Sequence, residues 1–242
     1  MPRFCLATVF LCSMLFISVY GQQREIELNG KNKNEIDLKY LFFLPEGYDD
    51  DQKSKWPLIL FLHGIGERGN DLELVKIHGI PKIVKTEKKF PFIALSPQCP
   101  ADYVWKDEAM QEAVLDLLLK ILKNYRVDNN RVYVTGLSVG GYGTWALAAK
   151  NPDLFAAAVP ICGGGEPSTA RVLKDMPIWV FHGARDEVVL PEESEKMVRA
   201  LQRVNGKVRY TLYPHAYHDS WTETYANPEL YDWLLTHKRT DY

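Results

Sequence analysis

The segment 131–143, Arg-Val-Tyr-Val-Thr-Gly-Leu-Ser-Val-Gly-Gly-Tyr-Gly, combines a strand, a sharp turn and the start of a helix. The β-branched and aromatic residues at 132–135 favour a strand, and residues 136–140 follow the pattern G-x-S-x-G. In this pattern the serine hydroxyl stands on a tight turn, because side chains at the flanking glycine positions would collide with the strand and the helix. We therefore predict that Ser138 is a nucleophile. A glycine-rich turn without a catalytic role is the alternative, which the preceding strand and the following glycines disfavour.

The same turn predicts where a negatively charged oxygen would be stabilised. The backbone N–H of Val139 lies at a helix N-terminus, which attracts negative charge. A second donor is expected in the loop after the apolar run 58–62, at the backbone N–H of Ile65. Each such donor stabilises the transition state by about 2.7–4 kcal/mol in comparable enzymes. Further along this loop, we expect Glu67 and Arg68 to be an ordinary solvated pair, and the alternative is that they line the entrance to the site.

Apolar runs alternate with helical segments along the rest of the chain. The runs that predict strands are residues 40–44, 58–62, 92–95, 132–135, 155–161, 178–181 and 208–212. One helix is predicted over 110–122, where apolar residues recur with the spacing of a helix face, and another follows Pro191 and ends at Asn205-Gly206. This alternation indicates an α/β fold with a mostly parallel central sheet and helices on both faces. We expect it to form a single domain over residues 22–242.

A serine nucleophile needs a general base, and the base needs a carboxylate that orients it. Where the serine stands on such a turn, the acid follows it in the chain and the histidine comes last. Asp186, in the loop after the predicted strand 178–181, is the predicted acid, and the adjacent Glu187 is the alternative. His182 ends that strand and therefore comes too early to be the base.

The loop after the predicted strand 208–212 contains two candidate bases, His215 and His218. We favour His218 because it lies deeper in the loop, beside the polar start of the final helix, whereas His215 follows a proline. The spacing His-x-x-His also occurs in metal sites, but no third ligand with useful spacing and no Cys/His cluster accompany it. We therefore expect neither a metal nor a cofactor.

Composition excludes several classes of protein. With 46% hydrophobic and 25% charged residues, the chain has the balance of a globular protein and lacks the profile of a disordered one. A net charge of −2 and a pI near 6.3 supply no general attraction for phosphate backbones, so we expect no nucleic-acid partner. Four cysteines are too few for a disulfide-dense scaffold.

The N-terminus predicts export. Arg3 precedes the uncharged apolar run 4–19, and small or apolar residues follow at 19–21. This order is typical of a signal peptide, which we assign to residues 1–21, so the mature protein is expected to be secreted or periplasmic. A retained anchor helix is the alternative, but the run is shorter than the roughly 20 residues that span a bilayer. No second apolar run of that length follows, so we expect no stable membrane insertion after cleavage.

Taken together, these motifs resemble the α/β-hydrolase superfamily, and most closely the secreted carboxylesterases related to the dienelactone hydrolase and phospholipase/carboxylesterase group. The matching stretches are LHGIGERGND (62–71), SPQCP (96–100), GLSVGGYGTW (136–145), PICGGG (160–165), FHGARDEVV (181–189) and YPHAYHDSW (213–221). The resemblance implies the α/β-hydrolase fold, and its implied site residues agree with those above: Ser138, Asp186 and His218, with oxyanion donors at Ile65 and Val139.

Two further expectations follow from the resemblance. Dienelactone hydrolases proper use a cysteine as nucleophile, whereas this chain has Ser138, which argues against dienelactone itself as the substrate. The family's strand order places two strands between the ends that carry Cys99 and Cys162, so both thiols are expected to be free.

The predicted activity is hydrolysis of carboxylic esters by a serine, through an acyl-enzyme. A small-molecule or carbohydrate ester, such as an acetyl or feruloyl ester, is the expected substrate. Trp105, Tyr142 and Trp221 are candidate substrate-binding residues because aromatic rings near the predicted loops stack on sugars or hold aromatic groups. Packing in the core or at the rim is the alternative for these rings. A peptidase or a phospholipase would use the same catalytic residues, and a non-catalytic binding module is least expected.

Overall fold

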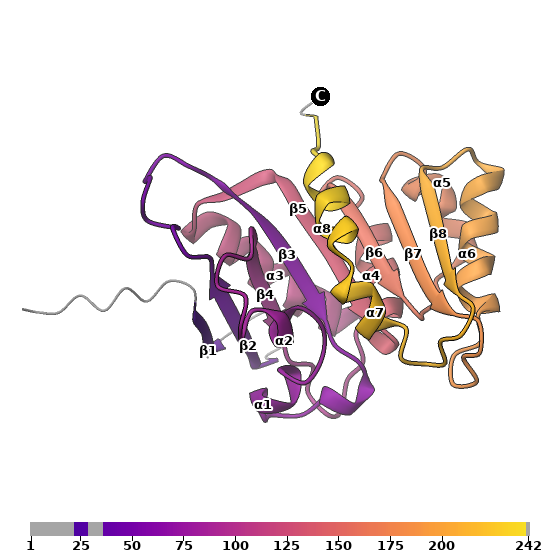
Figure 1. Ribbon diagram of the computed structural model, residues 1–242, viewed down its shortest axis with the longest axis horizontal. Coiled ribbons are helices and arrows are strands. Elements are labelled where there is room, and N and C mark those ends of the chain that lie inside the picture. Colours follow the sequence, from indigo (N-terminus) through magenta and orange to yellow (C-terminus); the bar gives the residue numbers. More distant parts are fainter. Residues whose placement is uncertain (1–21, 29–35, 241–242) are drawn as a thin grey trace, which may run out of the picture.

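The computed structural model describes residues 22–28 and 36–240, and an eight-stranded sheet lies at the centre of this part of the chain (Figure 1). The strand order is β1-β2-β4-β3-β5-β6-β7-β8. The pairs β1–β2 and β2–β4 are antiparallel and all other neighbouring pairs are parallel, which confirms the predicted mostly parallel sheet. The strands are β1 (Gln22–Leu28), β2 (Leu38–Leu44), β3 (Trp56–Leu62), β4 (Ile93–Pro97), β5 (Val127–Leu137), β6 (Ala157–Ile161), β7 (Ile178–Gly183) and β8 (Val208–Tyr213).

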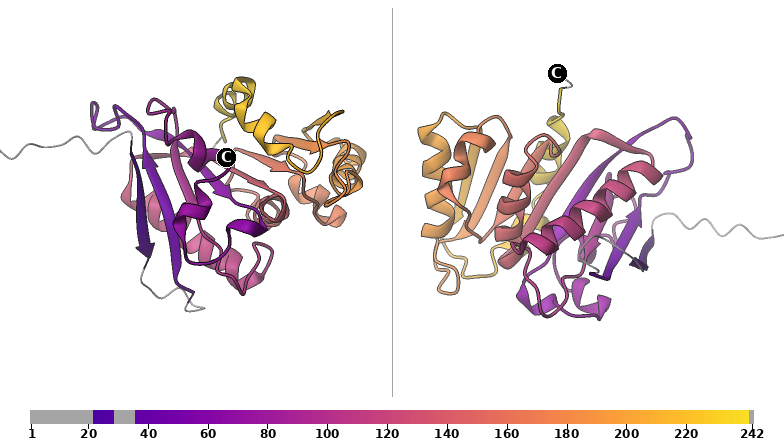
Figure 2. Two further views of the ribbon diagram at one scale, coloured as in Figure 1. Left: turned by 60° about the horizontal axis from the view of Figure 1, so that its bottom comes forward. Right: turned by 180° about the vertical axis from the view of Figure 1, so that it is seen from behind.

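Helices cover both faces of this sheet, as predicted (Figure 2). The α-helices are α1 (Leu72–Val75), α2 (Gly79–Ile83), α3 (Glu108–Asn124), α4 (Val139–Lys150), α5 (Ala170–Leu173), α6 (Glu192–Arg203), α7 (Trp221–Ala226) and α8 (Pro228–Thr236). Two 3₁₀ turns accompany them, η1 (Ile65–Glu67) and η2 (Pro167–Thr169). The two helices predicted from periodicity correspond to α3 and α6.

Each face of the sheet has its own apolar cluster. Helices α3, α4, α5 and α6 bury their apolar residues in one cluster, and α2, α7 and α8 in the other. Strand β3 contributes Leu58, Leu60 and Leu62 to the first cluster and Ile59 and Phe61 to the second. Successive side chains of a strand point to opposite faces, so a strand covered on both sides is apolar throughout. This is why β3 was recognisable as one continuous apolar run.

The seven predicted strand segments overlap β2 to β8. Strand β1 is present in the structure but was not predicted from the sequence. The sequence of β1, Gln-Gln-Arg-Glu-Ile-Glu-Leu, is mostly polar, as suits a strand at the edge of a sheet, and therefore lacks the apolar signal. Strand β5 begins at Val127, earlier than predicted, because a register shift opposite Trp56 and Leu58 lets a polar stretch join the ladder.

The proposed signal peptide, residues 1–21, lies outside the described residues. Within residues 22–28 and 36–240, no helix combines the length and the hydropathy required to cross a lipid bilayer. The assignment of residues 22–242 to one domain stays a prediction.

The topology brings the carboxyl ends of parallel strands to one edge of the sheet. Loops after β3, β5, β7 and β8 carry, in that order, Ile65, Ser138, Asp186 and His218. Ligands and reacting groups in open α/β sheets collect at this edge. The four residues singled out from the sequence therefore share one end of the molecule.

Close backbone contact between α4 and β3 predicts that replacing Gly140 destabilises the fold. A Cβ atom at Gly140 would lie 2.0 Å from the carbonyl oxygen of Leu62, and this backbone oxygen has no room to retreat. We expect Gly140→Ala to lower the free energy of unfolding by about 1–3 kcal/mol or more. Urea unfolding followed by tryptophan fluorescence measures this change.

The matched control is Gly66→Ala, because a Cβ at Gly66 meets nothing within 4 Å. We expect this variant to stay within about 0.5 kcal/mol of the parent protein. Equal stability of Gly140→Ala and Gly66→Ala would contradict the close approach.

Candidate active site

Ser138 joins β5 to α4 in a strained backbone conformation. Its φ of 54° and ψ of −118° are rare for a residue with a side chain, and such strain is concentrated at functional sites. A Cβ at Gly136 would lie 2.4 Å from the carbonyl oxygen of Gly140, so only glycine fits on the strand side of the turn. The backbone N–H of Ser138 donates to the carbonyl of Ile161 on β6, at 3.0 Å. Together these contacts fix the serine at the edge of the sheet.

The His218 imidazole, in the loop between β8 and α7, lies between Ser138 and Asp186. Its Nε2 is 3.0 Å from Ser138 Oγ, and its Nδ1 is 2.7 Å from Asp186 Oδ2. A carboxylate only accepts hydrogen bonds, so we assign the ring hydrogen to Nδ1, which leaves Nε2 able to accept the serine proton. The geometry therefore brings a hydroxyl, a base and an acid into one chain of hydrogen bonds.

The carboxylate of Asp186 is buried but well supplied with donors. Its residue is 2% exposed, and its Oδ1 accepts the backbone N–H groups of Val188 and Val189, both at 2.9 Å. Burial raises the pKa of Asp186, but the hydrogen bonds from His218, Val189 and Val188 outweigh it and lower the pKa overall. Asp186 is therefore held as a carboxylate, which is the form that can orient an imidazole. The alternative acid, Glu187, is exposed.

A second histidine contacts the same carboxylate. The Nε2 atom of His182 lies 3.2 Å from Asp186 Oδ2 and 2.8 Å from the carbonyl oxygen of Val189. Both partners are acceptors, so Nε2 carries the hydrogen, and burial lowers the pKa of His182, which favours the neutral ring. Both Nε2 contacts of His182 are with oxygen atoms of the loop that follows β7, and one of them helps to fix the carboxylate of Asp186. In the sequence, only the i, i+4 spacing of His182 and Asp186 could have signalled this contact.

The other candidate base, His215, is exposed, whereas His218 is half-buried. The turn of the chain after β8 brings His218 toward the sheet edge, and the hydrogen-bonded pair with Ser138 involves His218. The structure therefore separates two histidines that the sequence left close together.

The turn after β3, which carries Ile65, is held by the imidazole of His63. His63 Nε2 accepts the backbone N–H of Cys99 at 3.0 Å, so Nδ1 carries the hydrogen and donates to the carbonyl of Gly64 at 2.6 Å. In a trans peptide the C=O and the next N–H point in opposite directions, so the N–H of Ile65 is directed away from the imidazole. A Cβ at Gly64 would lie 3.9 Å from Ser138 Cβ, which places this turn directly beside the serine.

Glu67 and Arg68 do not form the solvated pair expected from the sequence. Glu67 is only 7% exposed, and its Oε2 is 3.9 Å from His63 Nδ1. Arg68 instead donates to the backbone carbonyls of Ala101 and Tyr103, at 2.9 and 3.1 Å. Burial raises the pKa of Glu67. The expectation was wrong because the short 3₁₀ turn η1 carries Glu67 under the loop.

The three aromatic residues proposed to bind substrate occupy different environments. Trp105 is 1% exposed and donates its indole N–H to the carbonyl of His63 at 2.8 Å, so it supports the turn beside Ser138 and is shielded from a bound molecule. The expectation that Trp105 contacts substrate was therefore wrong, because the side chain is buried. Tyr142 is half-buried beside a cavity along α4. Trp221 is half-buried, and its ring meets the His218 ring edge to face, with centroids 5.2 Å apart.

Both cysteines among the described residues are free and buried, which confirms the expectation. Strands β3 and β5 lie between β4 and β6, which precede the two thiols. Cys162 Sγ accepts the backbone N–H of Ser138 at 3.3 Å, and burial raises the pKa of Cys162 to about 12.

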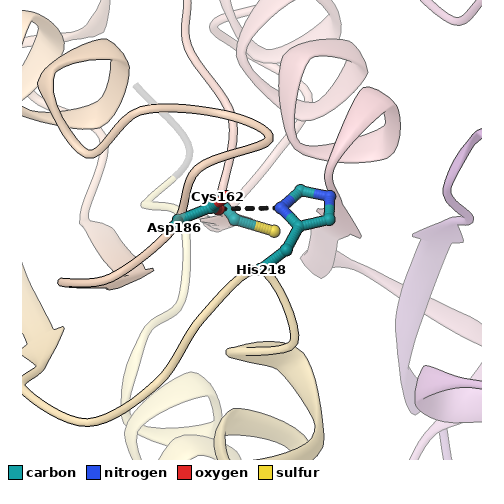
Figure 3. A group of neighbouring side chains, drawn as sticks. All are labelled: Cys162, Asp186 and His218. Carbon is teal, nitrogen blue, oxygen red and sulfur yellow. Dashed lines mark hydrogen bonds and ion pairs between the residues drawn. The ribbon is translucent and has the colours of Figure 1, made fainter.

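Cys162 also takes part in the one cluster of metal-type ligands found in the described part of the chain. Its Sγ and ligand atoms of Asp186 and His218 lie within 4.8 Å of one another (Figure 3). The raised pKa keeps the thiol protonated, and the carboxylate and imidazole already bond to each other. A metal ion would have to replace both arrangements, so the residues fit a hydrogen-bonded site better than a metal site.

A model of the dienelactone hydrolase family matches residues 96–231, more than half of the chain. The matched region includes Ser138, Asp186 and His218 and leaves out the turn that carries Ile65.

Individual proteins and solved structures are similar to this chain over only part of their own length. “Probable acetylxylan esterase A” of Aspergillus fumigatus is 27% identical over 160 residues, which is 55% of this chain and 42% of that protein. “Poly(3-hydroxyalkanoate) depolymerase C” of Paucimonas lemoignei is 56% identical over 41 residues, 17% of this chain and 10% of that protein. The solved structure of a thermostable esterase has a TM-score of 0.79 and 37% identity, over 91% of this chain and 64% of that chain. The chain thus covers less than two thirds of the length of each of these three proteins.

The buried imidazole of His63 predicts a specific loss of stability in acid. Burial lowers the pKa of His63 from 6.5 to about 4. Between these values the unfolded chain binds a proton that the folded protein does not, so the free energy of unfolding falls as the pH drops from about 6.5 to about 4. At about 1.4 kcal/mol per pKa unit, the loss from this residue amounts to about 3 kcal/mol.

Urea unfolding of the parent protein and of His63→Gln at several pH values in this window measures the effect. The variant should be less stable at pH 7 but should lose less stability on acidification, since all other titrating groups are shared. Identical pH dependence of the two proteins would show that His63 is not held neutral.

Proposed function

Because the chain belongs to the dienelactone hydrolase family and has the α/β-hydrolase fold, we propose that it hydrolyses carboxylic esters with Ser138 as nucleophile, His218 as general base and Asp186 as the orienting acid. The observation that carries the proposal is the unbroken chain of hydrogen bonds from Ser138 Oγ through the His218 ring to Asp186. A carboxylate, an imidazole and a hydroxyl in this order are the groups that serine hydrolases share on unrelated folds.

The first half of the reaction forms an acyl-enzyme. His218 Nε2 takes the proton of Ser138 Oγ, and the oxygen attacks the ester carbonyl carbon. The carbonyl oxygen becomes negative and accepts the backbone N–H groups of Ile65 and Val139. When the tetrahedral intermediate collapses, the C–O bond to the alcohol breaks, and His218 gives its proton to the departing alcohol oxygen. Asp186 stabilises the imidazolium that exists between the two proton transfers.

Water completes the reaction by the same route. His218 takes a proton from the water, whose oxygen attacks the acyl carbon, and the bond to Ser138 Oγ then breaks as the proton returns to the serine. The carboxylic acid is released and the free serine is restored. His218 carries out every proton transfer in this scheme, and the backbone amides of Ile65 and Val139 only donate hydrogen bonds, so the scheme draws on no cofactor and no metal ion.

Serine is the proposed nucleophile even though Cys162 lies close by. The Cys162 thiol has its pKa raised to about 12 by burial, and its sulfur accepts the N–H of Ser138. A thiol attacks as the thiolate, which this environment disfavours. Ser138, in contrast, has its oxygen within hydrogen-bond distance of a base.

Carbohydrate esters are the proposed substrate class. The match to the protein named “Probable acetylxylan esterase A” supports an acetyl group on a sugar, and the proposed signal peptide over residues 1–21 agrees with a polymeric substrate outside the cytoplasm. Peptide and phospholipid hydrolysis on the same residues are the alternatives. Hydrolysis of an acetyl ester but not of the matching anilide would exclude a peptidase, and the absence of interfacial activation on micellar substrates would exclude a lipase-like enzyme.

Ser138→Ala tests the nucleophile. We expect kcat/KM for p-nitrophenyl acetate to fall by about 10⁴-fold or more, because the variant lacks the hydroxyl that is hydrogen-bonded to His218. The variant should keep the melting temperature of the parent protein and lose labelling by a fluorophosphonate probe. Undiminished turnover in a folded variant would remove Ser138 from the mechanism.

Paired variants test the acid and the base against their neighbours in the sequence. Asp186→Asn and His218→Gln should each lower kcat for the same ester by about 10³–10⁴-fold, since either change breaks the hydrogen-bond chain. The matched controls Glu187→Gln and His215→Gln alter exposed residues and should stay within about twofold of the parent protein. A large loss in a control, together with activity in its partner variant, would reassign the role to the neighbour.

A further inference from the structure

A cavity of about 540 Å³ lies between α2 and α7, on the face of the sheet that these two helices cover. Its volume is within the range of about 300–1,000 Å³ that is usual for small-molecule sites. Apolar and aromatic groups form much of its lining, from Ile77, Gly79, Ile83, Trp221, Tyr225 and Ala226. An acetyl group alone would leave most of this volume empty.

Two contacts join the cavity to the candidate active site. The Trp221 ring, which lines the cavity, lies edge to face against the His218 ring at 5.2 Å. The same ring meets His78, another lining residue, at 5.5 Å, and His78 Nε2 is 3.8 Å from Oε1 of Glu67 in the turn beside Ser138. The cavity is therefore bounded by residues that touch both the base and the turn next to the serine.

The chemistry of the proposed reaction decides which part of an ester reaches this cavity. The leaving alcohol oxygen must receive its proton from His218 Nε2, so the alcohol group departs beside the His218 ring. Trp221 flanks that ring and forms the adjoining wall of the cavity. The alcohol side of the ester is thus directed along Trp221, toward α2 and α7.

The lining also indicates the kind of alcohol. Trp221 offers an aromatic surface to an apolar face, while the exposed Lys82 and Lys85 supply ammonium donors around it. The hydroxyls of Thr86 and Thr222 donate to Ile83 O and Asp219 Oδ2, so toward a ligand they act as acceptors. A sugar ring matches this combination, because it has apolar C–H faces and a rim of hydroxyl oxygens. A simple alkyl alcohol would use only the apolar part.

We propose that the cavity between α2 and α7 is the subsite for the alcohol part of the substrate and that it binds a pyranose ring stacked on Trp221. This assignment rests on the proposed ester hydrolysis by Ser138. A second cavity, of about 340 Å³, lies along α4 and is lined by Tyr142, Trp145 and Ala146. It provides the matched control, because a small alanine on a helix lines each of the two cavities.

The test compares two acetyl esters that differ only in their alcohol, acetylated methyl β-D-xylopyranoside and ethyl acetate. Ala226→Trp, at an exposed helix position, fills the cavity between α2 and α7. We expect it to lower kcat/KM for the xyloside by about tenfold or more and to change that for ethyl acetate by less than about twofold. Ala146→Trp, which fills the other cavity, should change neither value by more than about twofold. Thr86→Trp, a second exposed position in the first cavity, should reproduce the effect of Ala226→Trp.

Each other outcome overturns a defined part of the proposal. Loss of xyloside hydrolysis in Ala146→Trp, or none in Ala226→Trp and Thr86→Trp, would exclude the cavity between α2 and α7. Equal losses for both esters would show a general structural effect and would likewise remove the sugar subsite. Hydrolysis of ethyl acetate but not of the xyloside by the parent protein would overturn the subsite alone. Hydrolysis of neither ester, nor of p-nitrophenyl acetate, would overturn the proposed function itself.

Discussion

Holding Ser138 at a φ of 54° costs of order 1–3 kcal/mol, and the surrounding backbone must supply the contacts that keep it there. Gly136 and Gly140 let β5, α4 and the end of β3 approach so closely that a Cβ atom at either position would collide with the neighbouring backbone. The same approach brings the turn after β3 beside Ser138. The strained serine and the turn that carries Ile65 are therefore positioned by one set of backbone contacts, and neither can shift without the other.

The hydrogen bonds around Asp186 perform the second part of this positioning. His218, His182 and two backbone N–H groups all approach its carboxylate. A carboxylate with this many donors has little freedom to rotate, so the ring of His218 is held in the plane that points Nε2 at Ser138. The loops after β7 and β8 thus act as one unit, although they are separated along the chain by helix α6.

The sequence predicted the elements whose physical signal is local. Continuous apolar runs marked the buried strands, and G-x-S-x-G marked the turn at Ser138, because buried strands and tight turns restrict residue type position by position. Strand β1 was missed since its polar sequence is typical of a sheet edge as well as of a loop. Which strands are neighbours depends on contacts distant in sequence, and only the family resemblance supplied that order.

The candidate site shows the same division. The order serine, acid, histidine is a sequence property, and it led to the candidates Asp186 and His218, which the structure brings into hydrogen-bond contact with each other and, through His218, with Ser138. The burial of Glu67, the support of Asp186 by His182 and the burial of Trp105 are tertiary effects, since each depends on which loop covers the residue. The sequence around a loop residue does not reveal whether its side chain faces solvent or is buried beneath the loop. These were the points at which sequence reasoning was silent or wrong.

The position of Trp221 against His218 has a consequence for how selectivity would be expressed. One indole ring contacts the His218 ring and also lines the cavity between α2 and α7. In the proposed subsite, an alcohol group that pressed on this ring would also steady the imidazole opposite Ser138, so part of its binding energy would go into aligning the reacting atoms and not into tighter association. Preferred esters would then differ from poor ones mainly in how fast they turn over, while their apparent affinities stay alike.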